Sequence, residues 1–370
     1  SQHVPRDTFF RTMHDLGGEE INGTTDADGT SYFEIVPAAS VDAALWIEAD
    51  RMASARLGWS TDAIEREKNV VAQELRLRYK NEPNGFRYQL LTRAVYPEGH
   101  PYRRSLDEEK EMRASTADEM REFASHFYGP DDATLMLVGD ITVDRAKELV
   151  ARQFGAIAPC GAVRARPIAP VEVTTLKRLH IAANVAAPEV FVAWALPGPS
   201  EDGYYDLPFA LRLLEGGVAK FTEEDKKTTR PGSVTWTFDD QRLGSIGYVA
   251  ATLTPGGKPE DVVDAIEILR ARILRFDWAQ LGAQRSFSIA HEVRGVEALG
   301  DRAREMQRNL DMFGQADYEM TYLRNVQNVS SARSVAATDH FLDPARAAIV
   351  IVTPDANAPR SGRVIEEVKR

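Results

Sequence analysis

Residues 64–78 read IEREKNVVAQELRLR, and the rest of the chain is organised around this stretch. The residues favour helix, and Ser60 and Thr61 are N-cap candidates just before it. At 100° per residue, Glu67 and Glu74 lie within about 20° of each other on one helix face. Two carboxylates so placed can bind a metal ion or orient a water molecule, whereas spacing alone also fits an ordinary solvated helix face.

The composition is that of a globular protein large enough for two domains. The chain has 370 residues, of which 43% are hydrophobic and 27% are charged, and its formal net charge is −11. This acidity, with no block of Lys or Arg, excludes a nucleic-acid partner. No apolar run approaches the roughly 18 residues that a membrane helix needs. Cys160 is the single cysteine and therefore forms no internal disulfide.

The hydrophobic periodicity and the turn residues predict helices and strands in both halves of the chain. Helices are expected over 6–16, 41–55, 116–127, 144–154, 204–214, 259–275 and much of 279–307. Strands are expected over 21–25, 30–36, 133–138, 190–196, 233–238, 246–254 and 347–352. A segment rich in Pro and Ala around residues 156–175 predicts a linker. We therefore expect one domain over 1–158, a linker over 159–178 and a second domain over 179–370.

Two blocks of the first half recur in the second half in the same order. Residues 126–138 align without gaps to 340–352. Residues 29–37, followed by a helix at Val41, match 247–255, followed by a helix at Pro259. Repetition of this order predicts two copies of one α+β unit, each with a mostly antiparallel sheet and helices packed on one face.

The motifs around the helix of Glu67 and Glu74 resemble a known family. The segments 8–25, 30–37 and 46–52 precede these carboxylates, and His100-Pro101-Tyr102, 127–130 and 138–140 follow them. This ordered set resembles the N-terminal half of the insulinase/pitrilysin zinc peptidases, the inverzincins, over nearly the whole chain. The resemblance implies that Glu74 is a zinc ligand and that Glu67 is a supporting acid of the catalytic site.

One family motif is absent from the chain. The family's H-x-x-E-H helix supplies two zinc ligands and the general base, but no two of the seven histidines here lie within five residues of each other. We expect the missing ligands upstream of Ser1. The resemblance then implies a zinc metalloendopeptidase, and the alternative is a noncatalytic relative that serves as a scaffold or partner half. A periplasmic or other extracytoplasmic compartment is favoured over the cytoplasm.

The resemblance also implies a substrate edge and a partner. Asn22, Gly23 and Thr24 match a sheet edge that pairs with an extended peptide or unfolded-protein substrate. An Arg and a Tyr that grip the substrate follow a glycine turn in the family, but none follows the predicted turn Leu214-Glu215-Gly216-Gly217. We therefore expect a second two-domain half, either another subunit, identical or different, or a continuation beyond Arg370.

Overall fold

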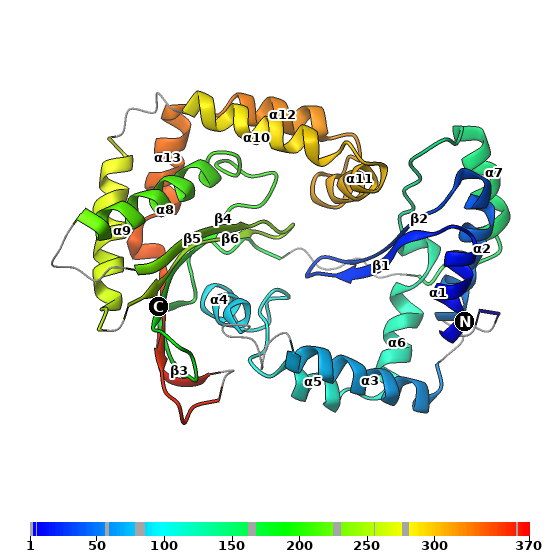
Figure 1. The fold of residues 1–370 in the computed structure, drawn as a ribbon, viewed down its shortest axis with the longest axis horizontal. Helices are drawn as coiled ribbons and strands as arrows, with labels where there is room; N and C mark the ends of the chain where they lie inside the picture. Colours follow the sequence, from blue (N-terminus) through cyan, green and yellow to red (C-terminus); the bar gives the residue numbers. More distant parts are fainter. Residues whose placement is uncertain are drawn as a thin grey trace. The chain divides into compact units, whose positions relative to one another are not determined.

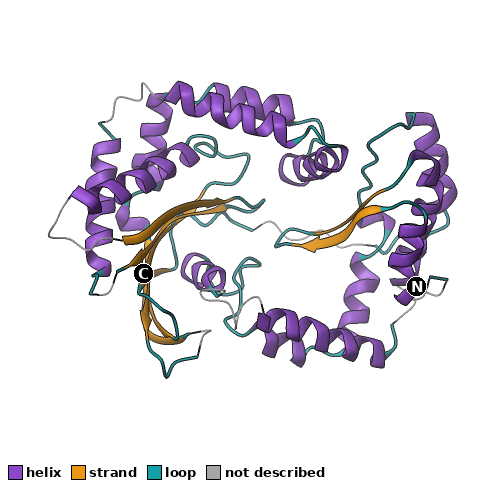
Figure 2. Cartoon of the chain, viewed as in Figure 1, coloured by secondary structure: helices purple, strands orange, loops and turns teal. Residues whose placement is uncertain are grey.

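The computed structural model describes residues 3–4, 6–55, 59–77, 86–161, 168–224, 231–254, 256–275, 281–359 and 362–370. These residues form helices and two sheets flanked by helices (Figure 2), which confirms the α+β class. The chain divides into two compact units, each built from three separate stretches. The first unit comprises 1–72, 110–167 and 293–319, and the second comprises 73–109, 168–292 and 320–370.

The first unit is built around a hairpin. Its strands are β1 (Glu19–Thr25) and β2 (Thr30–Ile35), which pair antiparallel. The Asp26 carboxylate accepts hydrogen bonds from the backbone N–H groups of Asp28 and Gly29 at 2.8 and 2.9 Å, which closes the turn. The helices that lie wholly or mostly in this unit are α1 (Arg6–Asp15), α2 (Val41–Ala55), α3 (Thr61–Leu75), α5 (Glu108–Ala114), α6 (Ala117–Phe127), α7 (Val143–Phe154) and α11 (Leu299–Phe313) (Figure 1).

The helix that opened the sequence argument, α3, is anchored by one buried side. Ile64, Lys68 and Ala72 are buried at every fourth residue, as an amphipathic helix requires. The Lys68 ammonium donates to the carbonyl oxygens of Arg113 and Ser115 at 3.1 and 2.8 Å and contacts Glu65 at 2.9 Å. Because its three donors all have partners, this lysine is buried without an unsatisfied charge.

The second unit contains a six-stranded sheet in the order β5-β6-β4-β7-β3-β8. Its strands are β3 (Leu176–Ala183), β4 (Glu189–Leu196), β5 (Pro231–Asp239), β6 (Ser245–Leu253), β7 (Ala348–Pro354) and β8 (Arg363–Lys369). Only the β3–β7 pair is parallel within this sheet, so it is mostly antiparallel. The helices of this unit are α4 (Arg87–Val95), α8 (Leu207–Glu224), α9 (Pro259–Ile273), α13 (Ser331–Phe341) and most of α10 (Leu281–Gly295) and α12 (Glu319–Gln327).

The main core lies on one face of this sheet. Alternate residues of β4, among them Val192 and Trp194, are buried in one cluster with side chains of α8, α9 and α13. The neighbouring residue Phe191 points to the opposite face, where the Arg87 guanidinium of α4 lies 5.5 Å from its ring centre. Helix α4 therefore covers part of the second face.

Most predicted elements are confirmed, with two corrections. Residues 133–138 form no strand, although the equivalent residues of the repeat form β7. Strand β7 is buried between β4 and β3, whereas Leu135 is 45% exposed and residues 133–138 pair with no strand in the described sheets. The predicted glycine turn after Leu214 is also wrong, because α8 continues through Gly216 and Gly217 to Glu224. No helix in the described ranges is long and apolar enough to cross a membrane.

Candidate functional site

The two predicted metal-site carboxylates lie on α3, away from its buried side. Glu67 and Glu74 are both exposed. The valines between them, Val70 and Val71, are also exposed, by 49% and 38%. The two valines are adjacent, so they form a small apolar patch beside the two carboxylates. This acid and valine stripe, residues 67, 70, 71 and 74, is suited to a covering element that brings further polar ligands.

The described residues do not complete a metal site by themselves. In the ranges that the structure covers, no group of three His, Cys, Asp or Glu side chains is close enough together to hold a metal ion. A structural or catalytic zinc ion needs at least three protein ligands. The stripe on α3 therefore fits zinc only as the carboxylate part of a larger ligand set.

The predicted substrate edge is accessible. Asn22, Gly23 and Thr24 lie on β1, and all three are exposed. Strand β1 pairs only with β2 in the described sheet, so its other edge carries backbone N–H and C=O groups that face away from β2. Gly23 lets the Tyr32 ring approach closely, because a Cβ atom there would lie 3.1 Å from Tyr32 Cδ1.

A cluster that the sequence did not indicate lies behind this edge. Tyr32 of β2 stacks under the Arg51 guanidinium, 3.6 Å from the ring centre, and its hydroxyl lies 3.3 Å from that of Tyr128. Arg51 Nε donates to Glu48 at 2.8 Å. Burial and the hydrogen bond with Tyr128 raise the pKa of Tyr32 to about 12. The cluster of Tyr32, Glu34, Glu48, Arg51 and Tyr128 thus holds one face of the hairpin against α2 and the end of α6.

Glu34 is the titrating member of this cluster. Burial, and then the neighbouring Glu48 carboxylate, raise its pKa from 4.5 to about 7, while Arg51 opposes the shift. The folded protein therefore binds a proton at Glu34 over a pH range in which the unfolded chain has lost it. The contribution of Glu34 to the free energy of unfolding therefore falls as the pH rises from about 4.5 to 7.

Glu34→Gln is expected to stabilise the protein at pH 8 by about 1 to 3 kcal/mol, because it removes the cost of ionising a half-buried carboxyl. At pH 4 the variant and the wild-type protein should have the same stability, since Glu34 is then protonated in both states. Urea unfolding at the two pH values measures the difference. The exposed Glu366→Gln on β8 is the control, and an equal gain at both pH values for Glu34→Gln would contradict the assignment.

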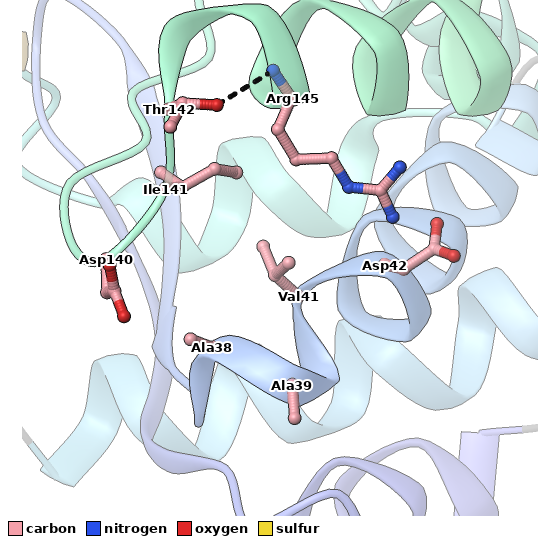
Figure 3. A pocket seen from close by; sticks show the side chains of 8 residues that line it. All are labelled: Ala38, Ala39, Val41, Asp42, Asp140, Ile141, Thr142 and Arg145. Carbon is pink, nitrogen blue, oxygen red and sulfur yellow. Dashed lines mark hydrogen bonds between the residues drawn. The ribbon is translucent and has the colours of Figure 1, made fainter.

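A shallow pocket of about 400 Å³ lies elsewhere in the first unit (Figure 3). Its lining residues are Ala38, Ala39, Val41, Asp42, Asp140, Ile141, Thr142 and Arg145. The Thr142 hydroxyl accepts a hydrogen bond from the Arg145 N–H at 3.3 Å and caps α7, and the Arg145 side chain extends toward Asp42. Hydrogen bonds from Gln153 and Arg152 lower the pKa of the Asp42 carboxyl. These contacts give the polar side chains of the pocket a structural role. None of the predicted site residues lines the pocket.

The histidine of the predicted loop motif is structural. His100 is buried, its ring stacks on Tyr96 with centres 4.3 Å apart, and its Nδ1 accepts from the Tyr102 N–H at 3.2 Å. Burial lowers its pKa, so the ring is neutral near pH 7. The accepting Nδ1 places the proton on Nε2.

Comparison with known proteins connects these features to one family. A family model described as "Peptidase M16 inactive domain" matches residues 114–276. The chain is 30% identical over 147 residues to a zinc protease, PqqE, of Helicobacter pylori, which covers 40% of this chain and 32% of that protein. The chain thus spans about a third of the length of this curated relative.

Two solved structures share the fold. The crystal structure of a protease from Helicobacter pylori matches 94% of this chain and 84% of its own, with a TM-score of 0.81 and 20% identity. The first half of the periplasmic protease PqqL from Escherichia coli matches 95% of this chain and 80% of its own, with a TM-score of 0.68 and 13% identity. At these identities the likeness shows the fold alone.

Proposed function

The chain is a relative of the insulinase/pitrilysin peptidases, and from this premise we propose that it forms part of a zinc-dependent endopeptidase that acts on extended peptides or unfolded proteins. The observation that carries the proposal is the stripe on α3, where Glu67 and Glu74 lie exposed beside two exposed valines. A scaffold helix has no need of paired carboxylates on a partly apolar surface.

In this proposal Glu74 binds the metal and Glu67 supports it from the same helix face. Zinc, when bound, acts as a Lewis acid and lowers the pKa of its water molecule. The two histidines and the general base of an H-x-x-E-H helix would complete the ligand set, and the exposed valines would pack against that helix. The chain contributes the orientation of both carboxylates, which follows from their seven-residue spacing on α3.

Strand β1 would receive the substrate. Its accessible edge at Asn22, Gly23 and Thr24 can pair with the backbone of an extended chain, and backbone pairing accepts many side-chain sequences. A second two-domain half would enclose the peptide. The match to one half of a longer periplasmic protease supports both this arrangement and an extracytoplasmic location.

A noncatalytic partner half is the second candidate. The matched family model is described as an inactive domain, and the described residues hold no metal-binding group of three. In this case β1 would still bind peptide, but hydrolysis would occur on a zinc-bearing partner subunit.

Intact mass and zinc content per chain distinguish the two candidates. About one zinc per chain, with peptide cleavage that stops on chelation, is the result expected for the peptidase. A chain of 41.1 kDa without zinc would overturn that function. If such a chain raised the activity of a zinc-bearing subunit, the partner-half function would be correct.

A further inference from the structure

The hairpin of β1 and β2 is held on its second face by a helix from the far end of the sequence. Tyr32 and Glu34 face α2, so the alternate residues Phe33 and Ile35 point to the other side. There α11 lies beside the hairpin (Figure 1). A Cβ atom at Gly300 of α11 would lie 3.1 Å from Ile35 Cδ1, so the helix approaches the strand closely.

Arg304 of α11 contacts both strands of the hairpin. Its guanidinium lies 5.0 Å from the centre of the Phe33 ring on β2, and its Nη1 donates to the Glu20 carboxylate on β1 at 3.4 Å. Its Nη2 donates to Asp301, one turn earlier on α11, at 2.5 Å. Because Asp301 holds the planar guanidinium in place, Arg304 can stack and donate at the same time.

The contact on β1 falls on a strained residue. Glu20 has a φ of +48°, and it is the only non-glycine residue with positive φ in the described chain. The strand register changes at the same point: Glu19 pairs with Ile35 and Asn22 pairs with Phe33, so β1 contains one extra residue. This is a β-bulge, and Glu20 lies within it.

The bulge decides how the edge of β1 is presented. Successive residues of a strand alternate the direction of their backbone groups, and a shift of one residue reverses the direction of each. Asn22 to Thr25 pair in unbroken register with residues 30–33 up to the turn, and the bulge separates this stretch from Glu19. Removing the bulge would therefore reverse the direction in which the N–H and C=O groups of Glu19 point relative to those of Asn22 to Thr24. A contact that stabilises Glu20 in its left-handed conformation also fixes this presentation.

We propose that Arg304 is a positioning residue for substrate: by joining Glu20 to Phe33 it holds the bulge, and so sets the register in which the β1 edge on the two sides of the bulge offers backbone groups to an extended peptide. This inference rests on the proposed function, in which β1 pairs with the substrate. It adds a residue that controls substrate positioning, Arg304, which lies 284 residues from Glu20 in sequence. The helix of Arg304 carries none of the proposed metal-site residues.

Amide hydrogen exchange in the full chain tests the clamp directly. Arg304→Gln removes the charge and the stacking on Phe33. It is expected to speed exchange over residues 19–25 roughly 5-fold, because that is the effect expected when a partly exposed cation–π contact and an exposed ion pair are lost together. Arg304→Lys keeps the charge but not the planar group, and should give a smaller increase. Amides of β6 in the second unit serve as the internal reference.

Arg308→Gln is the matched control, since Arg308 lies one turn further along α11 and contacts Glu305 of the same helix at 3.4 Å. This variant should leave exchange over 19–25 unchanged. Unchanged exchange in Arg304→Gln as well would overturn the clamp, because the bulge would then hold without the arginine.

A second measurement adds a short synthetic peptide without proline and follows protection of the β1 amides. Wild-type protein should show protection, and Arg304→Gln should need a roughly 5-fold higher peptide concentration for the same protection. Equal protection in both proteins would overturn the positioning role. Absence of protection in the wild-type protein would overturn the proposed substrate edge itself, and that failure is recognisable because it does not depend on the variant.

Discussion

Glu74→Gln is expected to weaken zinc binding by at least about 100-fold, because an amide oxygen replaces a charged carboxylate ligand and even changes beside a metal ligand cost 10- to 100-fold. The residue is exposed on α3, so an isosteric amide leaves the helix packing intact. Competition with a chelator measures the affinity, and peptide cleavage should fall in parallel. Glu67→Gln should weaken zinc binding by roughly 10-fold, as expected for a supporting acid.

The same helix provides the control. Glu65 lies nine residues before Glu74, which places it on the opposite side of α3, where it contacts Lys68. Glu65→Gln should leave zinc affinity unchanged. If Glu74→Gln and Glu65→Gln bound zinc equally well, Glu74 would not be a ligand, and the stripe on α3 would be only a solvated face.

Arg87→Leu is expected to lower the free energy of unfolding by about 2 to 3 kcal/mol, because it leaves a buried carboxylate without its cation. Glu189 is 4% exposed at the start of the interior strand β4, and the Arg87 guanidinium donates two hydrogen bonds to it at 2.5 and 3.2 Å. The arginine itself is 40% exposed, so solvent screening keeps the effect below that of a fully buried pair.

Removing both charges should restore most of the loss. In Arg87→Leu/Glu189→Leu no buried charge remains, and urea unfolding should place the double variant within about 1 kcal/mol of wild type. Arg363→Leu breaks the pair with the partly exposed Asp355, in which the arginine is 66% exposed, and should cost less than about 0.5 kcal/mol. A loss for Arg87→Leu no larger than for Arg363→Leu would refute the assignment.

Local patterns in the sequence predicted most of the elements. The spacing of apolar residues and the punctuation by Gly and Pro gave the bounds of α2, β2 and β6 to within one residue. The exposure of Glu67 and Glu74 on one side of α3 also agrees with their spacing. By contrast, the strand expected over 133–138 depended on a neighbouring strand, which is a tertiary condition that no local pattern contains.

The parts of the site that the sequence did not predict depend on contacts between distant residues. Tyr32 and Glu34 are two residues apart on a predicted strand, so the sequence already indicated that they share a face. Their partner Tyr128 lies 96 residues from Tyr32, which no local pattern indicates. No sequence pattern indicated a role for Arg304, because α11 has the pattern of an ordinary charged helix. The role follows only from the contact of α11 with β2 in the structure. The metal ligation by Glu74 and the domain bounds at 158 and 179 stay predictions.

The interleaving of the two compact units has a consequence for biosynthesis. The first unit includes residues 293–319, and the second includes residues 73–109, so neither is contiguous along the polypeptide. A nascent chain on the ribosome cannot complete the first unit until α11 has left the exit tunnel, long after the hairpin has been made. Folding is therefore expected to be slow and largely post-translational, and the unfinished hairpin, with its open backbone edge, is the segment that a chaperone would need to shield in the meantime.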